Sequence, residues 1–480
     1  MTLTDWSGVL VTLWLLFAVY AAGHALLSRR DPRTAWGWIA VCWLFPFAGP
    51  ALYFLFGVNR IRTRALRLGM EARVRGPAGA LHEDDVRNRL GNGEAIPMWL
   101  EELARTADRL TDLPLLGGNR IEPLHCGEQA YPRMLAAIED AKASIELATY
   151  IFDNDATGLR FVDALACAKE RGVGVRVLID GFGQHYSLRP ITGELRRRGI
   201  DYAVFNPLRL LPPSLHLNLR NHRKLLLVDG QVGFTGGMNI GRRHMVSAGG
   251  ASAPAVDVQF EIHGPVLAQL AQVFADDWRL CGKPAPPRPP PSPVAARPGA
   301  SCRVLTDGPN EDFDHLAMVI QAAISAARRE VLIMTPYFLP PNEMIAELQA
   351  AALRGVEVQV ILPEKNNLPF VHWATRNMLG ELLRFGVRVW YQPLPFCHSK
   401  LFVVDGAYAQ IGTANLDPRS LKLNFELAVE IYDRAFAQTL STHFNAVRSK
   451  SREVSLEEIT GRPLPARLRD ALFWLFSPYL

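Results

Sequence analysis

Residues 218–239 read Asn-Leu-Arg-Asn-His-Arg-Lys-Leu-Leu-Leu-Val-Asp-Gly-Gln-Val-Gly-Phe-Thr-Gly-Gly-Met-Asn. In this stretch His222, Lys224 and Asp229 stand at positions i, i+2 and i+7. A turn of small residues follows them and ends at Asn239. We expect the rest of the chain to bring this stretch together with a second one like it.

A second stretch has the same spacing. His398, Lys400 and Asp405 again stand at i, i+2 and i+7, and the following turn ends at Asn415. One such match carries little weight, because a loose three-residue pattern arises by chance in roughly one long chain in a hundred. Two copies with matching sequels indicate a duplicated site.

The residue types of both motifs suit chemistry on a phosphate. Each motif leads into an apolar run, residues 225–228 or 402–404, which predicts a short buried strand. Positions i and i+2 point the same way on a strand, so the histidine and lysine of each motif share one face. The imidazole can attack or protonate while the ammonium neutralises phosphate oxygens. A carboxylate at the far end of the strand can orient an imidazole, as in catalytic triads.

The duplication extends beyond the motifs. Residues 141–152 are echoed by residues 327–338, and Asp257 and Glu426 hold matched positions after the two motifs. Strand patterns alternate with helix patterns in the same order in both halves, which predicts an α/β fold. We expect two tandem α/β repeats that form one pseudo-two-fold catalytic unit, with the two histidines across one pocket.

The first sixty residues are typical of a membrane anchor. Residues 9–27 and 35–58 contain no Asp, Glu, Lys or Arg, and each is long enough to cross a bilayer, so we expect two N-terminal transmembrane helices. A signal peptide is the alternative for the first, but no basic residue precedes it and a second apolar stretch follows. Pro46 and Pro50 predict a kink or a re-entrant turn in the second.

Arginines predict the topology. Four of them, between Arg60 and Arg67, follow the second stretch, and three lie between the two stretches. An even number of spans places the N-terminus and the large domain on one side, and the positive-inside rule favours the cytoplasm.

Charge and cysteine content exclude other classes of protein. The net charge of +5 over 480 residues is too balanced to indicate nucleic-acid binding, and no nucleic-acid partner is expected. The six cysteines form no CxxC pair, so neither a disulfide framework nor a zinc site is expected.

We expect the chain to divide into six segments. They are a membrane anchor (1–59), a juxtamembrane connector (60–116), a first repeat (117–283), a Pro-rich linker (284–300), a second repeat (301–452) and an amphipathic tail (453–480).

Three segments outside the repeats carry further expectations. The connector is predicted to contain a helix near residues 98–110, and its basic start could rest on anionic lipids or be an ordinary solvated linker. An apolar loop at residues 207–217 has no counterpart in the second half and is either buried or faces the bilayer at the substrate entrance. Basic and then aromatic residues at 467–480 predict an interfacial segment, with packing on the core as the alternative.

The two motifs are similar to the HxKxxxxD motifs of the phospholipase D superfamily. The N-terminal apolar pair, residues 335–338 and residues 412–426 resemble the bacterial cardiolipin synthases, and the likeness covers about residues 8–435. Three places depart from the family pattern, and one of them is Cys397-His398-Ser399, where Leu-His-Ala is usual. Arg-Arg-His-Met follows Gly241 where an acidic and aromatic pair is more common, and Val256 stands where many members have arginine.

The resemblance implies phosphatidyl transfer in the bacterial inner membrane. One phosphatidylglycerol would give its phosphatidyl group to another, producing cardiolipin and glycerol, with phosphatidylethanolamine as the other candidate for the second lipid. By family analogy His222 is the nucleophile and His398 is first the acid and then the base. A hydrolytic phospholipase D or a nuclease could use the same site with water.

The resemblance also implies roles for the remaining site residues. The lysines would hold phosphoryl oxygens and the asparagines would donate hydrogen bonds; no metal or other cofactor is needed, because the lysines supply the positive charge. Asp257 and Glu426 are better candidates than Asp229 and Asp405 for binding the histidine ring nitrogens. The candidate catalytic residues are His222, Lys224, Asp229, His398, Lys400 and Asp405, and the candidate substrate-binding residues are Asn239, Asn415, Asp257 and Glu426.

Overall fold

The computed structural model describes residues 3–28, 32–57, 97–207, 219–247, 253–287, 299–308 and 314–477. The chain divides into two compact units, residues 1–71 and 72–480, and each is described by itself. Residues 208–217 of the apolar loop and most of the Pro-rich linker lie outside the described residues.

The N-terminal unit contains one helix that can cross a membrane. Its elements are α1 (Leu3–Ser28), α2 (Pro32–Leu44), α3 (Ala48–Leu52) and a π-helical turn, η1 (Tyr53–Gly57). Among the described residues, only Gly8–Ser28 is long and apolar enough for a span. The second predicted span is not confirmed, because α2 ends before Pro46 and Phe47 has a φ of 58°. The predicted kink is therefore present, since proline has no N–H to continue the helix.

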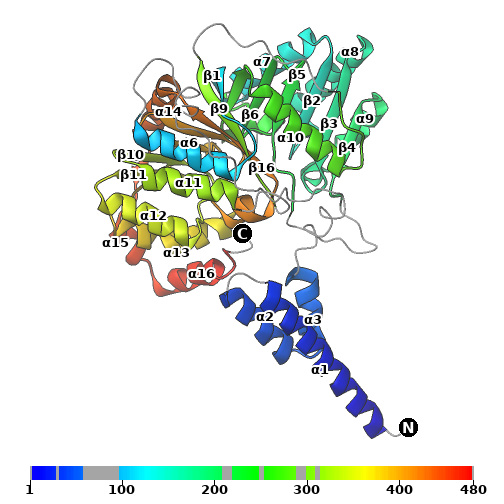
Figure 1. Ribbon diagram of the computed structural model, residues 1–480, viewed down its shortest axis with the longest axis vertical. Coiled ribbons are helices and arrows are strands. Elements are labelled where there is room, and N and C mark those ends of the chain that lie inside the picture. The colour runs from blue at the N-terminus through cyan, green and yellow to red at the C-terminus, as the bar shows by residue number, and fades with distance from the viewer. Residues whose placement is uncertain are drawn as a thin grey trace. The chain divides into compact units, whose positions relative to one another are not determined.

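The larger unit contains two sets of alternating strands and helices (Figure 1). The first set comprises β1 (Leu116–His125), α7 (Cys126–Asp140), β2 (Ser144–Thr149), α8 (Ala156–Glu170), β3 (Gly174–Asp180), η2 (Gly183–Tyr186), α9 (Thr192–Arg197), β4 (Asp201–Phe205), β5 (Leu225–Val228), β6 (Val232–Gly236), η3 (Arg242–His244), β7 (Ala255–Val256), β8 (Val258–His263) and α10 (Leu267–Leu280). The second comprises β9 (Ala300–Asp307), α11 (His315–Ala326), β10 (Glu330–Met334), α12 (Asn342–Leu353), β11 (Glu357–Pro363), α13 (Pro369–Leu383), β12 (Arg388–Gln392), β13 (Phe396–Cys397), β14 (Leu401–Val404), β15 (Tyr408–Gly412), η4 (Arg419–Leu423), β16 (Glu426–Tyr432) and α14 (Arg434–Arg448). The remaining elements are α6 (Met98–Leu110), β17 (Arg452–Glu453), α15 (Leu456–Thr460) and α16 (Leu464–Trp474).

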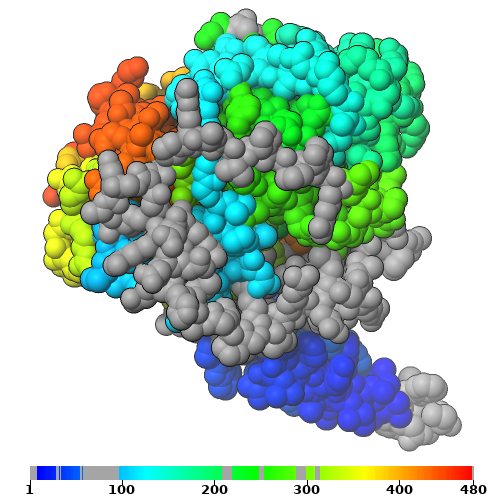
Figure 2. Space-filling model, turned by 45° about the horizontal axis from the view of Figure 1, so that its top comes forward, coloured from blue at the N-terminus to red at the C-terminus, as the bar shows by residue number. Residues whose placement is uncertain are grey.

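The strand order of the large sheet mirrors itself about its centre. The order of its 15 strands is β17-β12-β11-β10-β14-β15-β16-β9-β1-β8-β6-β5-β2-β3-β4. Outward from the antiparallel pair of β9 and β1, the strands of the two halves follow in matching order: β16 and β8, β15 and β6, β14 and β5, β10 and β2, β11 and β3, and β12 and β4. Strand β17 has no counterpart in the first half. This order confirms the predicted tandem α/β repeats, and Figure 2 shows the repeats, cyan to green and yellow to orange, packed as one body. The bounds of the six segments stay predictions.

Each repeat has its own apolar core, and α6 contributes to the second one. The helix predicted near residues 98–110 is confirmed, with Trp99, Leu103 and Ala107 in the core cluster that surrounds β10 and β11. Arg303 is fully buried and pairs with both Asp108 of α6 and Glu430 of β16. The C-terminal part of the expected connector is therefore packed structure.

Candidate active site

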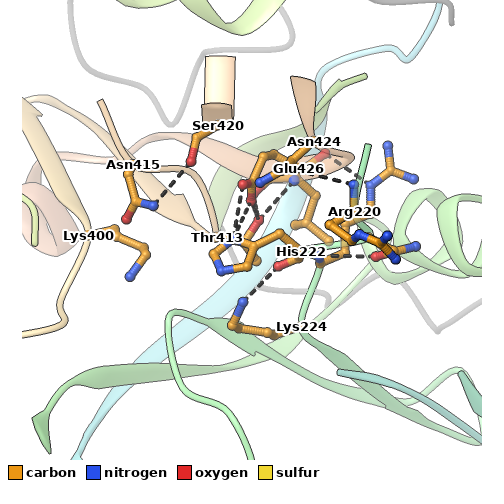
Figure 3. Close-up of polar contacts among 12 residues, drawn as sticks. Arg220, His222, Lys224, Lys400, Thr413, Asn415, Ser420, Asn424 and Glu426 are labelled. Atoms are coloured by element: carbon orange, nitrogen blue, oxygen red, sulfur yellow. Dashed lines mark hydrogen bonds and ion pairs between the residues drawn. The ribbon is translucent and has the colours of Figure 1, made fainter. Parts of the chain in front are cut away.

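Each site histidine hydrogen-bonds to a carboxylate of the other repeat. His222 Nδ1 lies 2.9 and 3.0 Å from the two carboxylate oxygens of Glu426 (Figure 3). His398 Nδ1 lies 2.7 Å from Asp257 Oδ2. Both contacts agree with the expectation that Asp257 and Glu426 bind the ring nitrogens. Neither repeat alone contains a complete histidine–carboxylate pair.

Backbone pairing between the repeats places these side chains. The N–H of His222 donates to the carbonyl of Phe425 at 2.9 Å, one residue before Glu426. In the second repeat, β13 pairs with β7, and the N–H of His398 donates to the carbonyl of Val256 at 2.8 Å. Each histidine is thus tied to the residue before its carboxylate partner, which fixes the distance between the two side chains.

The electrostatics favour neutral imidazoles. The pKa of His222 is lowered to about 4, chiefly by burial and also by the charges of Lys224 and Lys400, against the opposing effect of Glu426. Burial, and then the charges of Lys400 and Lys224, hold the pKa of His398 well below its ordinary value. Since each Nδ1 faces a carboxylate, it carries the proton, and the Nε2 lone pair is left for the reaction.

The two lysines lie beside the histidines. Lys224 Nζ donates to the carbonyl of His222 at 2.8 Å, and Lys400 Nζ donates to that of His398 at 2.7 Å. An ammonium has three N–H donors, so these bonds leave donors for phosphate oxygens. Burial lowers the pKa of Lys224 to about 7 and also lowers that of Lys400. A bound phosphodiester would favour the charged form of both.

The two carboxylates differ in pKa. Burial alone would raise the pKa of Glu426, but the charges of His222 and Lys224 and hydrogen bonds from His222 and Thr413 lower it below its ordinary value. Burial raises the pKa of Asp257 to about 6, against the effect of Lys400. Glu426 is therefore firmly ionised at neutral pH, whereas Asp257 titrates close to it.

Asp229 and Asp405, two of the candidate catalytic residues, bind backbone groups at turns, and their catalytic role stays a prediction. The carboxylate of Asp229 accepts hydrogen bonds of 2.7–2.8 Å from the backbone N–H groups of residues 142–144. That of Asp405 accepts 2.8–2.9 Å bonds from residues 328–330. Seven residues of extended chain cover about 20 Å, so neither carboxylate reaches an imidazole. Both fix the turn that leads into β2 or β10.

The two asparagines hold the loops that follow β6 and β15. Asn239 Oδ1 accepts a hydrogen bond of 3.1 Å from the backbone N–H of Ile151. Asn415 Nδ2 donates to Ser420 Oγ at 3.1 Å (Figure 3), and its Oδ1 is buried without a hydrogen-bond partner in the described structure. Their hydrogen bonds to substrate stay a prediction.

Three site neighbours were not singled out from the sequence. The ring of Tyr150 meets His222 edge to face at 5.0 Å between centroids. Thr413 donates to Glu426 at 2.5 Å. The buried ring of His244 lies 6.1 Å from that of His398, within the Arg-Arg-His-Met departure from the family pattern. Tyr150 directly follows an echoed strand, so the repeat itself could have pointed to it.

Metal ligands are not grouped in the described part of the chain, where no three His, Cys, Asp or Glu side chains lie together as a metal ion would require. The positive charges beside the two histidines come from Lys224 and Lys400. The arrangement can bind an anion, attack it from one side and protonate it from the other.

Comparison with known proteins identifies this arrangement. The family described as "Cardiolipin synthase, PLD-like domain" matches residues 134–278 and 320–448, and "Phospholipase_D-nuclease N-terminal" matches residues 12–57. The fold and site are thus those of the phospholipase D superfamily. The chain belongs to the bacterial cardiolipin synthases, which are phosphatidyltransferases of this superfamily.

Curated relatives match over nearly the whole chain. The major cardiolipin synthase of Bacillus subtilis is 31% identical over 491 residues, which are 99% of each chain. Cardiolipin synthase A of Pseudomonas putida is 32% identical over 485 residues, 98% of each chain. The solved phosphatidylserine synthase of Haemophilus influenzae shares the fold, with a TM-score of 0.61 at 19% identity, over 79% of this chain and 100% of that one.

Proposed function

We propose that the protein transfers the phosphatidyl group of one phosphatidylglycerol to the terminal glycerol hydroxyl of another, giving cardiolipin and glycerol. The observation that carries the proposal is the crossed pairing of His222 with Glu426 and of His398 with Asp257. It supplies two imidazoles whose Nε2 atoms are available, next to two lysine ammonium groups. A two-step displacement at one phosphorus needs a nucleophile, an acid that becomes a base, and positive charge on the phosphoryl oxygens.

In the first step, His222 Nε2 attacks the phosphorus of the first phosphatidylglycerol. A P–N bond forms and the P–O bond to the head-group glycerol breaks. The departing oxygen takes a proton from Nε2 of His398, which takes up that proton from solvent when the anionic phosphodiester binds and raises its pKa. Lys224 and Lys400 bind the oxygens on which charge develops. The products of this step are glycerol and a phosphatidyl-histidine.

In the second step, the hydroxyl of the acceptor lipid gives its proton to Nε2 of His398. The resulting oxygen attacks phosphorus, a new P–O bond forms, and the P–N bond to His222 breaks. The acceptor has become cardiolipin, and both imidazoles have returned to their initial protonation states. Water in place of the lipid hydroxyl would give phosphatidic acid instead.

The unequal carboxylates support His222 as the nucleophile. Phosphorylation at Nε2 with a proton on Nδ1 leaves the ring positively charged, so a firmly ionised partner stabilises the intermediate. Glu426 has its pKa lowered and faces His222, whereas the pKa of Asp257, which faces His398, is raised to about 6. The partner of His222 is therefore the stronger support for a cationic ring.

Product analysis and trapping test this proposal. Purified full-length protein with phosphatidylglycerol should form cardiolipin and glycerol, and His222→Ala and His398→Ala should each abolish turnover. His263→Ala, which changes an exposed histidine outside the site, should retain it. A phosphorus-labelled donor should leave acid-labile label on the peptide that contains His222. Phosphatidic acid as the only product, or label on the peptide that contains His398, would contradict the transfer or the assignment.

We further propose that the catalytic unit lies on the cytoplasmic side of the bacterial inner membrane and that the second apolar stretch completes a multi-pass anchor. The apolar helix at Gly8–Ser28 supports membrane association, and the arginines between Arg60 and Arg67 support the orientation by the positive-inside rule. Protease protection of the catalytic unit in right-side-out vesicles tests it, since a periplasmic unit would be digested from outside.

A further inference from the structure

Helix α16 exposes a stripe of leucines. Leu464, Leu468, Leu472 and Leu475 are each between 55% and 65% exposed. Their spacing of four, four and three residues places them on one side of an α-helix. Trp474 and Phe476 are also exposed at the C-terminal end of the helix. This is a contiguous apolar surface rather than a scatter of single side chains, and such surfaces mark interaction sites.

The opposite side of α16 is fixed to α13, so the stripe is not a misplaced core face. Asp470 is fully buried and accepts hydrogen bonds from Arg376 at 3.0 Å and from Arg469 at 2.8 Å, and it also pairs with Arg462. On the same side, the ring of Phe473 packs on that of Trp373 with 4.9 Å between centroids. Figure 1 shows α16 lying along α13 at the border of the unit.

The charges around the stripe select its partner. Residues 462–476 contain three arginines and one aspartate, a net charge of +2, and the aspartate is the buried Asp470. By helical period, Arg467 and Arg469 lie on the two flanks of the leucine stripe. Leucines flanked by arginines, with tryptophan and phenylalanine at one end, match the interfacial helices that lie in anionic bilayer surfaces. We propose that α16 docks the catalytic unit onto the surface of an anionic phospholipid bilayer.

The position of α16 connects this surface to the active site. Phe473 belongs to an apolar cluster with Tyr337 and Leu339, which follow the end of β10. Met334, the last residue of β10, pairs with Leu401, three residues after His398. The docking helix therefore lies at the same end of the sheet as the site. Contact of α16 with a bilayer brings the site to the surface where a lipid substrate resides, and this consequence rests on the proposed function.

Photocrosslinking to lipid tests the docking itself without using activity. The full-length protein, in nanodiscs that contain phosphatidylglycerol, carries a photoreactive residue at Leu468 or Leu472, or at Leu353 as the control. Leu353 is 69% exposed at the end of α12, which runs back from the site end of β10 to the start of β11. We expect at least fivefold more lipid adducts at 468 and 472 than at 353. Equal yields, or adducts between two protein copies in place of lipid adducts, would overturn the proposal.

Turnover gives a second, separate readout. Leu468→Gln with Leu472→Gln should lower turnover of phosphatidylglycerol in bilayers about tenfold and leave turnover of a short-chain, micellar phosphatidylglycerol unchanged. Leu353→Gln should change neither. Equal losses in both substrate forms would overturn the proposal. If the wild-type protein makes no cardiolipin from either form, the proposed function fails, while the adduct yields still decide the docking.

Discussion

Replacing Glu426 with glutamine isolates the contribution of the crossed carboxylate. The side chain keeps its size and one carbonyl oxygen for the Nδ1–H of His222, but it loses the charge that stabilises a cationic ring. Both partners are buried, with Glu426 at 0% and the His222 side chain at 12% exposure, so solvent screens the interaction little. A hydrogen bond to a charged group contributes about 1.5–3 kcal/mol. At about 1.36 kcal/mol for each factor of ten in rate, kcat should fall by about 13- to 160-fold.

The assay is cardiolipin formation from phosphatidylglycerol, normalised to the amount of folded protein. In single-turnover experiments with labelled donor, Glu426→Gln should slow the appearance of the phosphatidyl-histidine itself. Glu430→Gln is the matched control, because Glu430 is equally buried on the same strand but pairs with Arg303 outside the site. A loss of less than twofold for Glu426→Gln, or an equal loss of kcat for Glu430→Gln, would refute the proposed role of the carboxylate.

Three further predictions follow from charge and hydrogen bonding. The pKa of Lys224 is lowered to about 7, and the charged form is the active one. A plot of kcat/KM against pH should therefore fall as the pH rises through about 7, and this fall should occur at higher pH in Lys224→Arg. The pKa of His222 is about 4 in the folded protein, below its ordinary value of 6.5. The stability that the neutral imidazole contributes is therefore fully present above pH 6.5 and is lost as the pH falls toward 4. Thermal unfolding should show a smaller drop in Tm over this pH range for His222→Asn than for the wild-type protein. Asp405→Ala removes the acceptor of three backbone N–H groups and should lower the free energy of unfolding by about 2 kcal/mol. The kcat per folded molecule should change less than twofold. A loss of kcat without a loss of stability in denaturant titrations would instead support a catalytic role for Asp405.

Local patterns were sufficient to predict the repeated architecture. An apolar run after each motif predicts a strand wherever it lies, and the strands β5 and β14 occur where the runs at 225–228 and 402–404 placed them. Matched positions in the two halves also pointed to Asp257 and Glu426 as the partners of the ring nitrogens. These inferences needed only side-chain periodicity and the order of segments.

The crossing of the pairs could not be predicted in the same way. It depends on backbone pairing between residues more than 140 positions apart, such as His398 with Val256 and His222 with Phe425. Hydrophobic periodicity carries no information on which repeat a strand end will meet. The contact of the Asp229 carboxylate with the turn before β2 could not be predicted for the same reason, because spacing within the motif does not show which backbone groups a side chain will meet.

The crossed pairs also explain why the site needs two repeats. A single repeat presents a histidine and a lysine on one face, but its carboxylate points to the histidine of the other repeat. The antiparallel pairing of β1 with β9 at the sheet centre and the contacts of His222 and His398 with the opposite repeat create both pairs at once. A change that separates the repeats therefore removes both acid–base groups together, while a change inside one repeat, such as Glu426→Gln, weakens one step and leaves the other pair in place. Duplication also freed the two carboxylates to differ, and under the proposed mechanism their different pKa values distinguish the nucleophile from the proton carrier in an otherwise symmetric site.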